Sequence, residues 1–148
     1  TRCNLQCSMC VKYTAGSCIP ECDLELDVFH HLLPSLTTID NLVLSGIGES
    51  LLHPNLSEII ALARKHMPAS GTIGVQSNGL LLDRDKAADL IEQGLTSLCL
   101  SVDSFSDRCS LNHETREHSF QAVKEAVNNV NSAREFTSTK LDLGLQID

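Results

Sequence analysis

The stretch CNLQCSMC, residues 3–10, carries three cysteines, Cys3, Cys7 and Cys10, in the spacing C-x3-C-x2-C. A loop of this length can place all three sulfurs around one small inorganic centre, because thiolates are soft ligands that favour iron-sulfur clusters, zinc and copper(I). Disulfide pairing fits poorly, since an odd thiol would be left over. On a cubane of four irons, three protein ligands leave one iron open, and an open metal position is where chemistry on a small molecule takes place.

This run resembles the signature of the radical S-adenosylmethionine (radical SAM) enzymes, which carry three cysteines at this spacing and usually an aromatic or large apolar residue just before the third. Met9 stands at that position, and the lead-in TRCNL at residues 1–5 is similar to the family's exit from its first strand. The resemblance implies a [4Fe-4S] cluster on Cys3, Cys7 and Cys10. It also implies that the amino and carboxylate groups of SAM occupy the fourth iron.

Length and composition limit the classes of protein to consider. The chain has 148 residues, 42% of them hydrophobic, which is enough for one domain with a buried core. A net charge of -8 argues against broad binding to nucleic acid, which relies on clustered Lys and Arg. No apolar run approaches the roughly 20 residues that span a bilayer, so we expect no membrane partner. Seven cysteines without a disulfide-like framework favour a reducing compartment, with the cytoplasm as the default.

A glycine-rich turn follows the first clear strand, which we expect at residues 39–45 with residues 42–44 as a short buried run. Glycines at the carboxyl end of a strand let a ligand approach the backbone, and a carboxylate there can bind an ammonium group. A tight strand-to-helix turn would show the same pattern. The turn resembles the radical SAM family's Gly-Gly-Glu motif, with serine where the family often has proline. The resemblance implies that SAM's amino group is held by Gly46, Gly48 and Glu49.

The next expected strand, residues 73–76, ends in the sequence Ser-Asn-Gly at residues 77–79. The radical SAM family often has Thr-Asn-Gly at this point, so the resemblance implies a contact between Asn78 and SAM. Glycine after asparagine is also a plain turn signal, and both interpretations stay open.

A further strand is expected at residues 98–103, where apolar and polar residues alternate. Under period-two geometry Cys99, Ser101 and Asp103 share one face, which points toward a ligand if the sheet curls into a barrel. Ser-x-Asp resembles the family's fourth strand, where polar side chains reach the ribose or the methionine end of SAM. Capping of the strand end by these polar groups explains the pattern equally well.

Helical periodicity and capping residues predict the helices between the strands. An apolar stripe predicts a helix over residues 26–36, which Pro34 ends or kinks. Asn55, with Glu58 three residues later, predicts a capping box at the start of the next helix. Other expected boundaries are the cap residue Asp83, a helix end at Gly94, a helix over residues 115–134 and a strand from Leu141.

Alternation of strands and helices predicts an α/β fold with parallel strands. Every candidate ligand group falls at the carboxyl end of a strand or in the loop after it, where α/β barrels and open α/β sheets build their sites. The resemblance implies a partial (β/α)6 TIM-like barrel, truncated before the first strand and after about the fifth. Because the chain begins with Thr1 and stops within a strand-like alternation, we expect residues 1–148 to be an incomplete radical SAM core domain.

The resemblance implies an enzyme that cleaves SAM reductively to a 5'-deoxyadenosyl radical, which abstracts hydrogen from an unidentified substrate such as a peptide or a cofactor precursor. An external one-electron reductant, flavodoxin-like or ferredoxin-like, is implied as the partner. Beyond the three cluster cysteines, the sequence shows no dedicated general base, and the first step needs none.

Two interpretations without catalysis stay open from the residues alone. A structural zinc would need a closed fourth ligand, which Cys18 or Cys22 would provide. An electron carrier would need four cysteine ligands and no SAM pocket. Of the two cysteines left, Cys99 is expected to be a buried thiol, and Cys109 shows no recognisable pattern.

Overall fold

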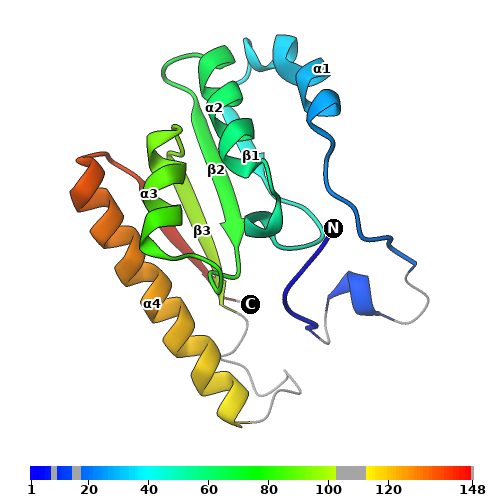
Figure 1. Cartoon of the computed structure of the whole chain (residues 1–148), viewed down its shortest axis with the longest axis vertical. Coiled ribbons are helices and arrows are strands. Elements are labelled where there is room, and N and C mark those ends of the chain that lie inside the picture. The colour runs from blue at the N-terminus through cyan, green and yellow to red at the C-terminus, as the bar shows by residue number, and fades with distance from the viewer. Residues whose placement is uncertain (8–9, 15–17, 103–112, 148) are drawn as a thin grey trace.

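The computed structural model describes residues 1–7, 10–14, 18–102 and 113–147, with side chains left out at residues 113–120 and 147. Three positions singled out in the sequence, Met9, Asp103 and Cys109, lie outside the described residues. Within the described part, four α-helices and four strands alternate along the chain after a loop that carries Cys3, Cys7 and Cys10 (Figure 1).

The four strands form one parallel sheet in the order β1-β2-β3-β4. Strands that are consecutive in the sequence therefore lie side by side. Because they are parallel, the chain must return along the outside of the sheet between one strand and the next, and the helices form these connections. The strands are β1 (Asn41–Leu44), β2 (Thr72–Ser77), β3 (Ser97–Val102) and β4 (Asp142–Ile147). The α-helices are α1 (Leu26–Leu36), α2 (Leu56–His66), α3 (Arg84–Glu92) and α4 (His113–Thr137), and the short 3-10 helices are η1 (Val11–Tyr13) and η2 (Ser50–Leu52).

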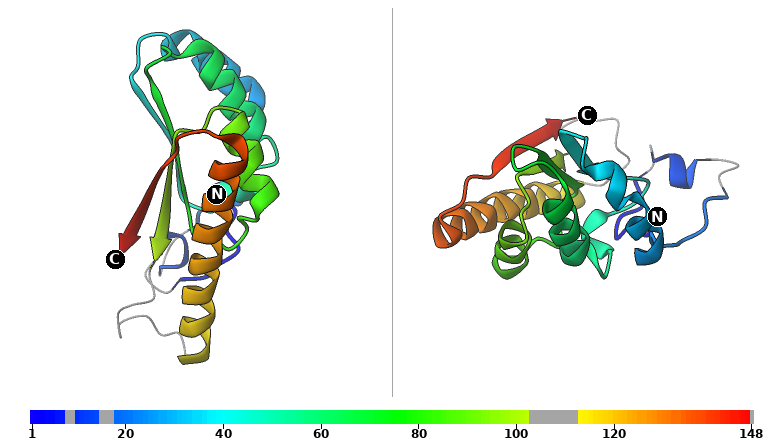
Figure 2. Two further views of the ribbon diagram at one scale, coloured as in Figure 1. Left: turned by 90° about the vertical axis from the view of Figure 1, so that its left-hand side faces the viewer. Right: turned by 90° about the horizontal axis from the view of Figure 1, so that it is seen from above.

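The helices lie on one side of the sheet, as the left view of Figure 2 shows. The alternation in β3 follows from this arrangement, because Leu98, Leu100 and Val102 are buried against the helices while Cys99 and Ser101 lie on the opposite face, half-buried. The expected buried run at residues 42–44 is wrong. Val43 is 65% exposed, because in the described part of the chain no helix covers its face of the sheet.

Local signals set most of the helix ends. The Asp83 carboxylate caps α3 by accepting a hydrogen bond from the Lys86 N–H, as predicted. Pro34 lies inside the last turn of α1 rather than ending it. The expected capping box at Asn55 is wrong, since its side chain makes no cap bond and instead donates to the Glu58 carboxylate at 3.2 Å. Asn55 has φ -107° and ψ 22°, away from the extended backbone usual at this position.

None of the helices in the described part of the chain is long and apolar enough to cross a membrane. The longest, α4, has 25 residues and buries one stripe against the sheet and α3, including Val123, Ala126 and Val130.

The one-sided packing predicts a contrast between two substitutions on the sheet. Leu100→Ala removes a side chain that is fully buried under the helices, so we expect a loss of about 2–5 kcal/mol in the free energy of unfolding. Val43→Ala changes the exposed face and should cost less than about 1 kcal/mol. Urea unfolding of the two variants measures both values. Similar losses would contradict the assignment of the two faces.

Candidate active site

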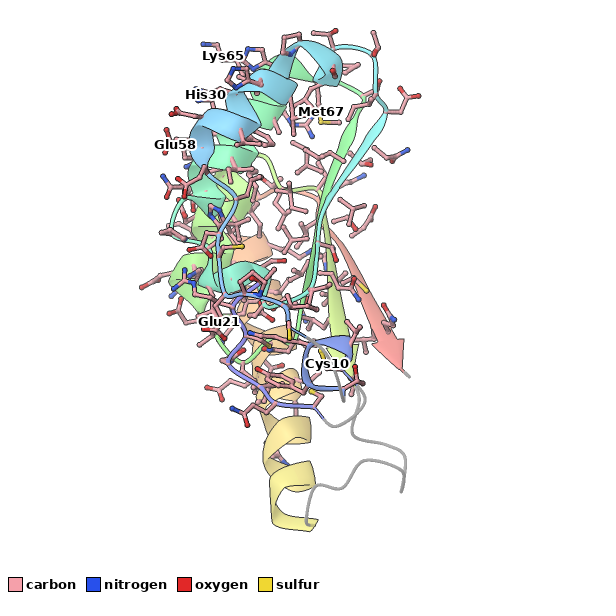
Figure 3. The ribbon with its side chains drawn as sticks, turned by 90° about the vertical axis from the view of Figure 1, so that its right-hand side faces the viewer. Cys10, Glu21, His30, Glu58, Lys65 and Met67 are labelled. Carbon is pink, nitrogen blue, oxygen red and sulfur yellow. The ribbon has the colours of Figure 1, made fainter. Side chains whose placement is uncertain are left out.

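A cavity of about 320 Å³ lies at the carboxyl ends of β1, β2 and β3. Figure 3 shows Cys10 and Glu21 at this end of the molecule, far from Lys65 and Met67 at the other. The cavity is lined by Cys3, Leu5, Cys7, Cys10, Lys12, Ser45, Gly46, Gly48, Glu49, Gln76, Ser77, Asn78 and Ser101.

The cysteine loop turns its three thiols into this cavity. Cys3, Cys7 and Cys10 are half-buried, and the Cys10 N–H donates to the Cys7 carbonyl oxygen at 3.0 Å. The Leu5 N–H donates to the Cys3 sulfur at 3.4 Å. The backbone of the loop therefore already supplies one hydrogen bond to a sulfur.

The start of the chain fixes this loop to the glycine-rich turn after β1. The Glu49 N–H donates to the Arg2 carbonyl oxygen at 2.7 Å. Arg2 also makes a bidentate ion pair with Asp23, with Nε–Oδ1 and Nη2–Oδ2 distances of 3.1 and 2.7 Å. The same guanidinium group donates to the Leu52 carbonyl oxygen at 2.8 Å. The two backbones approach so closely that a Cβ added at Gly48 would lie 2.5 Å from the Arg2 carbonyl oxygen.

The carboxylate of Glu49 joins the turn after β1 to the end of β2. Its Oε1 accepts from the Ser77 hydroxyl at 2.7 Å and from the Leu51 N–H at 2.9 Å, and its Oε2 accepts from the Asn78 N–H at 2.8 Å. The residue is 6% exposed. A carboxylate offers about four acceptor positions, so one is left after these three bonds.

Asn78 links the turn after β2 to the cysteine loop. Asn78 Nδ2 donates a hydrogen bond to Asn4 Oδ1 at 2.7 Å, and Asn78 Oδ1 accepts one from the Leu80 N–H at 3.0 Å. Ser77 tightens the same turn by accepting from the Gly79 N–H at 2.9 Å. Two turns and the cysteine loop are therefore tied together by side chains.

Lys12 is a buried lysine in the wall of the cavity. Its side chain is 5% exposed, and its ammonium group donates to the Thr1 carbonyl oxygen at 2.8 Å and to the Glu21 carboxylate at 2.6 Å. The hydrogen bond with Glu21 raises the pKa of the Lys12 ammonium group, and the same bond lowers the pKa of the Glu21 carboxyl. The pair is therefore ionised at neutral pH.

Buried polarity is concentrated around this cavity. In the part of the chain whose side chains are described, the buried polar or charged residues are Lys12, Glu49 and Ser77, and all three line the cavity that holds the thiols. Burying polar or charged groups costs free energy, so such groups are found in protein interiors mainly where they are hydrogen-bonded and at functional sites. The sequence predicted Glu49 but missed Lys12 and Ser77.

The structure brings most of the predicted site residues together. The three cysteines, Gly46, Gly48, Glu49, Asn78 and Ser101 all line the one cavity. Cys99 does not, and it is half-buried on the open face of β3 rather than buried as expected. Cys18 is exposed, and Cys22 is exposed beside a neighbouring cavity of about 390 Å³. Among the described residues no three His, Cys, Asp or Glu side chains are grouped closely enough for a single metal ion.

A polar ladder crosses the open face of the sheet next to this site. The Ser45 hydroxyl donates to Gln76 Oε1 at 3.1 Å, and Gln76 Nε2 donates to Gln146 Oε1 at 2.8 Å. In a barrel this face is the interior, so the ladder and Ser101 supply hydrogen-bonding groups beside the cavity.

A model of the radical SAM superfamily matches residues 1–143. The chain belongs to the radical SAM superfamily. This confirms the family predicted from the cysteine loop, and it places the chain among enzymes. Two curated relatives are similar in sequence: GTP 3',8-cyclase of Chlorobaculum tepidum, 35% identical over 84% of this chain, and the tungsten-containing aldehyde ferredoxin oxidoreductase cofactor-modifying protein of Pyrococcus furiosus, 30% identical over 70%. The chain spans 37% and 28% of the lengths of these radical SAM relatives.

Solved structures show the same radical SAM fold. The structure of BtrN in complex with AdoMet and 2-DOIA matches 98% of this chain and 53% of that one, with a TM-score of 0.65 and 14% identity. Methylornithine synthase (PylB) matches 99% of this chain and 50% of that one, with a TM-score of 0.53 and 15% identity. At these identities the likeness concerns the fold, and it confirms the predicted α/β partial barrel of parallel strands.

The contact between Gly48 and Arg2 predicts different outcomes for two neighbouring glycines. Gly48→Ala places a Cβ against a backbone oxygen at a φ of +146°, so we expect it to lower the free energy of unfolding by more than about 1 kcal/mol. An added Cβ at Gly46 meets nothing within 4 Å, and Gly46→Ala should stay within about 1 kcal/mol of the wild type. Urea unfolding measures both. Equal values for the two variants would contradict this account of the turn.

Proposed function

We propose that this chain is the core domain of a radical SAM enzyme, with a [4Fe-4S] cluster held by Cys3, Cys7 and Cys10 and with SAM bound beside it. The observation that carries the proposal is that the three thiols and the Gly-Ile-Gly-Glu turn, residues 46–49, line one cavity at the carboxyl ends of parallel strands. That is the rim at which α/β barrels build their active sites.

The cavity fits a cluster. It is lined by three cysteines of one short loop, and the Leu5 N–H already donates to one of the sulfurs. On a cubane each cysteine binds a different iron, so the sulfurs line a wall rather than surround a point. Such N–H···S contacts and the burial of the loop are the means by which a protein tunes the reduction potential of an iron-sulfur cluster.

When bound, the cluster and SAM supply the chemistry, reductive cleavage of SAM to a 5'-deoxyadenosyl radical that abstracts hydrogen from the substrate. The protein's part is position and shielding. We propose that Gly46 lets SAM approach the backbone, that the remaining acceptor position of Glu49 takes its ammonium group, and that Asn78 and Ser101 contact it from β2 and β3. Gly48 keeps the turn pressed against Arg2. Met9 and Asp103, outside the described residues, keep the SAM-contacting roles that the resemblance implies.

The substrate and the partners belong to the whole protein, of which we propose that residues 1–148 form an incomplete core domain. One relative is named for GTP and the other for modification of a cofactor, which supports a cofactor precursor or another small molecule ahead of a peptide. We propose a flavodoxin-like or ferredoxin-like protein as the one-electron donor. Seven cysteines without a disulfide-like framework favour a reducing compartment, for which we propose the cytoplasm.

Electron paramagnetic resonance of the full-length protein tests the proposal. The protein is reconstituted with iron and sulfide without oxygen, reduced with dithionite and measured with and without SAM. We expect a [4Fe-4S]+ signal whose shape changes when SAM is added, because SAM binds the open iron. A protein that holds no cluster, or a signal indifferent to SAM, would contradict the proposal and favour a structural metal or an electron carrier.

The ligand assignment predicts which cysteines the cluster needs. Cys3→Ala, Cys7→Ala and Cys10→Ala should each abolish a stable cluster, because a cubane held by two thiolates is easily lost. Cys99→Ala, on the open face of β3, serves as the matched control and should keep its iron. Iron and sulfide content and the visible absorption after reconstitution measure the outcome. A cluster that survives the loss of Cys7 would refute the assignment.

The proposed role of the remaining acceptor position of Glu49 predicts that a substitution there weakens SAM binding without affecting cluster binding. Glu49→Gln removes the negative charge that faces SAM's ammonium group, so we expect SAM affinity to fall by about tenfold, the loss typical of a hydrogen bond to a charged group. Iron content should not change, because Glu49 holds no metal. Glu58→Gln, at an exposed carboxylate on α2, is the control. Calorimetric titration with SAM that finds equal affinities for both variants would remove this role from Glu49.

A further inference from the structure

The cysteine loop has two sides, and its side chains alternate between them. Cys3, Leu5 and Cys7 line the cavity. Asn4 and Gln6, which alternate with them along the chain, are exposed and do not line it. Neighbouring side chains of an extended segment point to opposite sides, so a turn of this segment about its own axis would exchange the two sets. A contact that holds the outer side therefore also decides where the thiols point.

Asn4 makes such a contact on the outer side. Its Oδ1 accepts a hydrogen bond from Asn78 Nδ2 at 2.7 Å, and Asn78 belongs to the turn after β2. The bond from the Leu5 N–H to the Cys3 sulfur, by contrast, stays within the loop. A bond within the loop shapes it, whereas a bond to a second element sets how the loop lies against the sheet. The bond of Asn4 is of the second kind.

The partners of Asn78 fix which way round its amide group lies. The Leu80 backbone N–H, which can only donate, bonds to Asn78 Oδ1 at 3.0 Å. The amide nitrogen of Asn78 therefore points toward the loop, and the side chain at position 4 must present an acceptor to it. Asparagine and aspartate both carry an acceptor oxygen at this point of the side chain. Alanine does not, so the chemistry of the contact makes a specific demand on position 4.

We propose that Asn4 is a positioning residue of the cluster site, whose bond to Asn78 keeps the thiols of Cys3 and Cys7 directed into the cavity before any metal is bound. Asn4 is exposed and Asn78 is half-buried, so water can replace the bond, and its loss releases the outer side of the loop. The inference rests on the proposed function, because these thiols are the proposed cluster ligands. It gives Asn78 a role beyond the turn and the SAM contact that its sequence context allowed.

Thiol labelling of the metal-free full-length protein tests the proposal. The protein is treated with iodoacetamide, and mass spectrometry of its peptides follows the labelling rate of each cysteine. We expect Asn4→Ala to label Cys3 and Cys7 about two- to tenfold faster than the wild type, because the loss of one hydrogen bond increases local opening by about that factor. Cys22 and Cys99 lie outside the loop and serve as internal references, so they should label at wild-type rates.

Three further variants separate the hydrogen bond from other effects of substitution. Asn4→Asp keeps an acceptor oxygen and should restore the slow labelling of the wild type. Gln6→Ala removes the other exposed amide of the same stretch, which makes no hydrogen bond to any residue that the structure describes, and should match the wild type. In an Asn78→Ala background the acceptor at position 4 has already lost its donor, so Asn4→Ala should change the labelling rate little there.

Unchanged labelling of the two loop thiols in Asn4→Ala would overturn the inference. Equally fast labelling in Gln6→Ala or Asn4→Asp would do so too, as would a rise of the same size with and without the Asn78 side chain. Parallel acceleration at Cys99 would show that the variant opens the whole fold, which also overturns the inference. Reconstitution of the wild type with iron and sulfide tests the proposed function separately, because the labelling is done without metal and decides the role of Asn4 alone.

Discussion

The buried carboxylate of Glu49 is the interaction on which the rest of the site depends. It accepts hydrogen bonds from the Ser77 hydroxyl and from the N–H groups of Leu51 and Asn78, so one side chain fixes the turn after β1 to the end of β2. A charge at 6% exposure is tolerable only if nearly all of its acceptor positions find donors. Because the N–H of the same residue binds the Arg2 carbonyl oxygen, the cysteine loop is fixed to this point as well.

One-sided packing explains why the site lies at this rim and faces this way. The helices bury the apolar face of the sheet, including Leu98 and Leu100, and leave the polar face of β3 to Ser101. The carboxyl ends of parallel strands all lie at the same edge of the sheet, so the turns that follow them lie close together at that edge. The open face carries the ladder through Gln76, which presents hydrogen-bonding groups to the space beside the cavity.

Local patterns in the sequence predicted the cysteine loop, the parallel α/β order and the two faces of β3, because spacing and period-two alternation record geometry directly. These patterns failed where contacts with distant parts of the chain decide the burial of a residue or its hydrogen-bond partners. Three consecutive apolar residues around Val43 look the same whether one face or both are covered, and only the layer of helices decides. Ser77 and Lys12 carried no signal, since their partners lie 28 and 11 residues away and a single sequence records no such pairing.

The ties between distant segments also bear on the cost of loading a cofactor. The segment from Thr1 to Asp23 contains only one short 3-10 helix in its described part, and such a loop loses much conformational entropy when its sulfurs are fixed. Its ends are already joined, because Thr1 bonds to the carbonyl oxygens of Pro20 and Cys22, and Asn4 bonds to Asn78. Folding therefore bears the cost of ordering the loop, and a group that binds in this cavity meets walls that are already in place, which raises affinity without adding a contact. The same hydrogen bonds join the loop that carries the three cysteines and the turn that carries Glu49 into one unit.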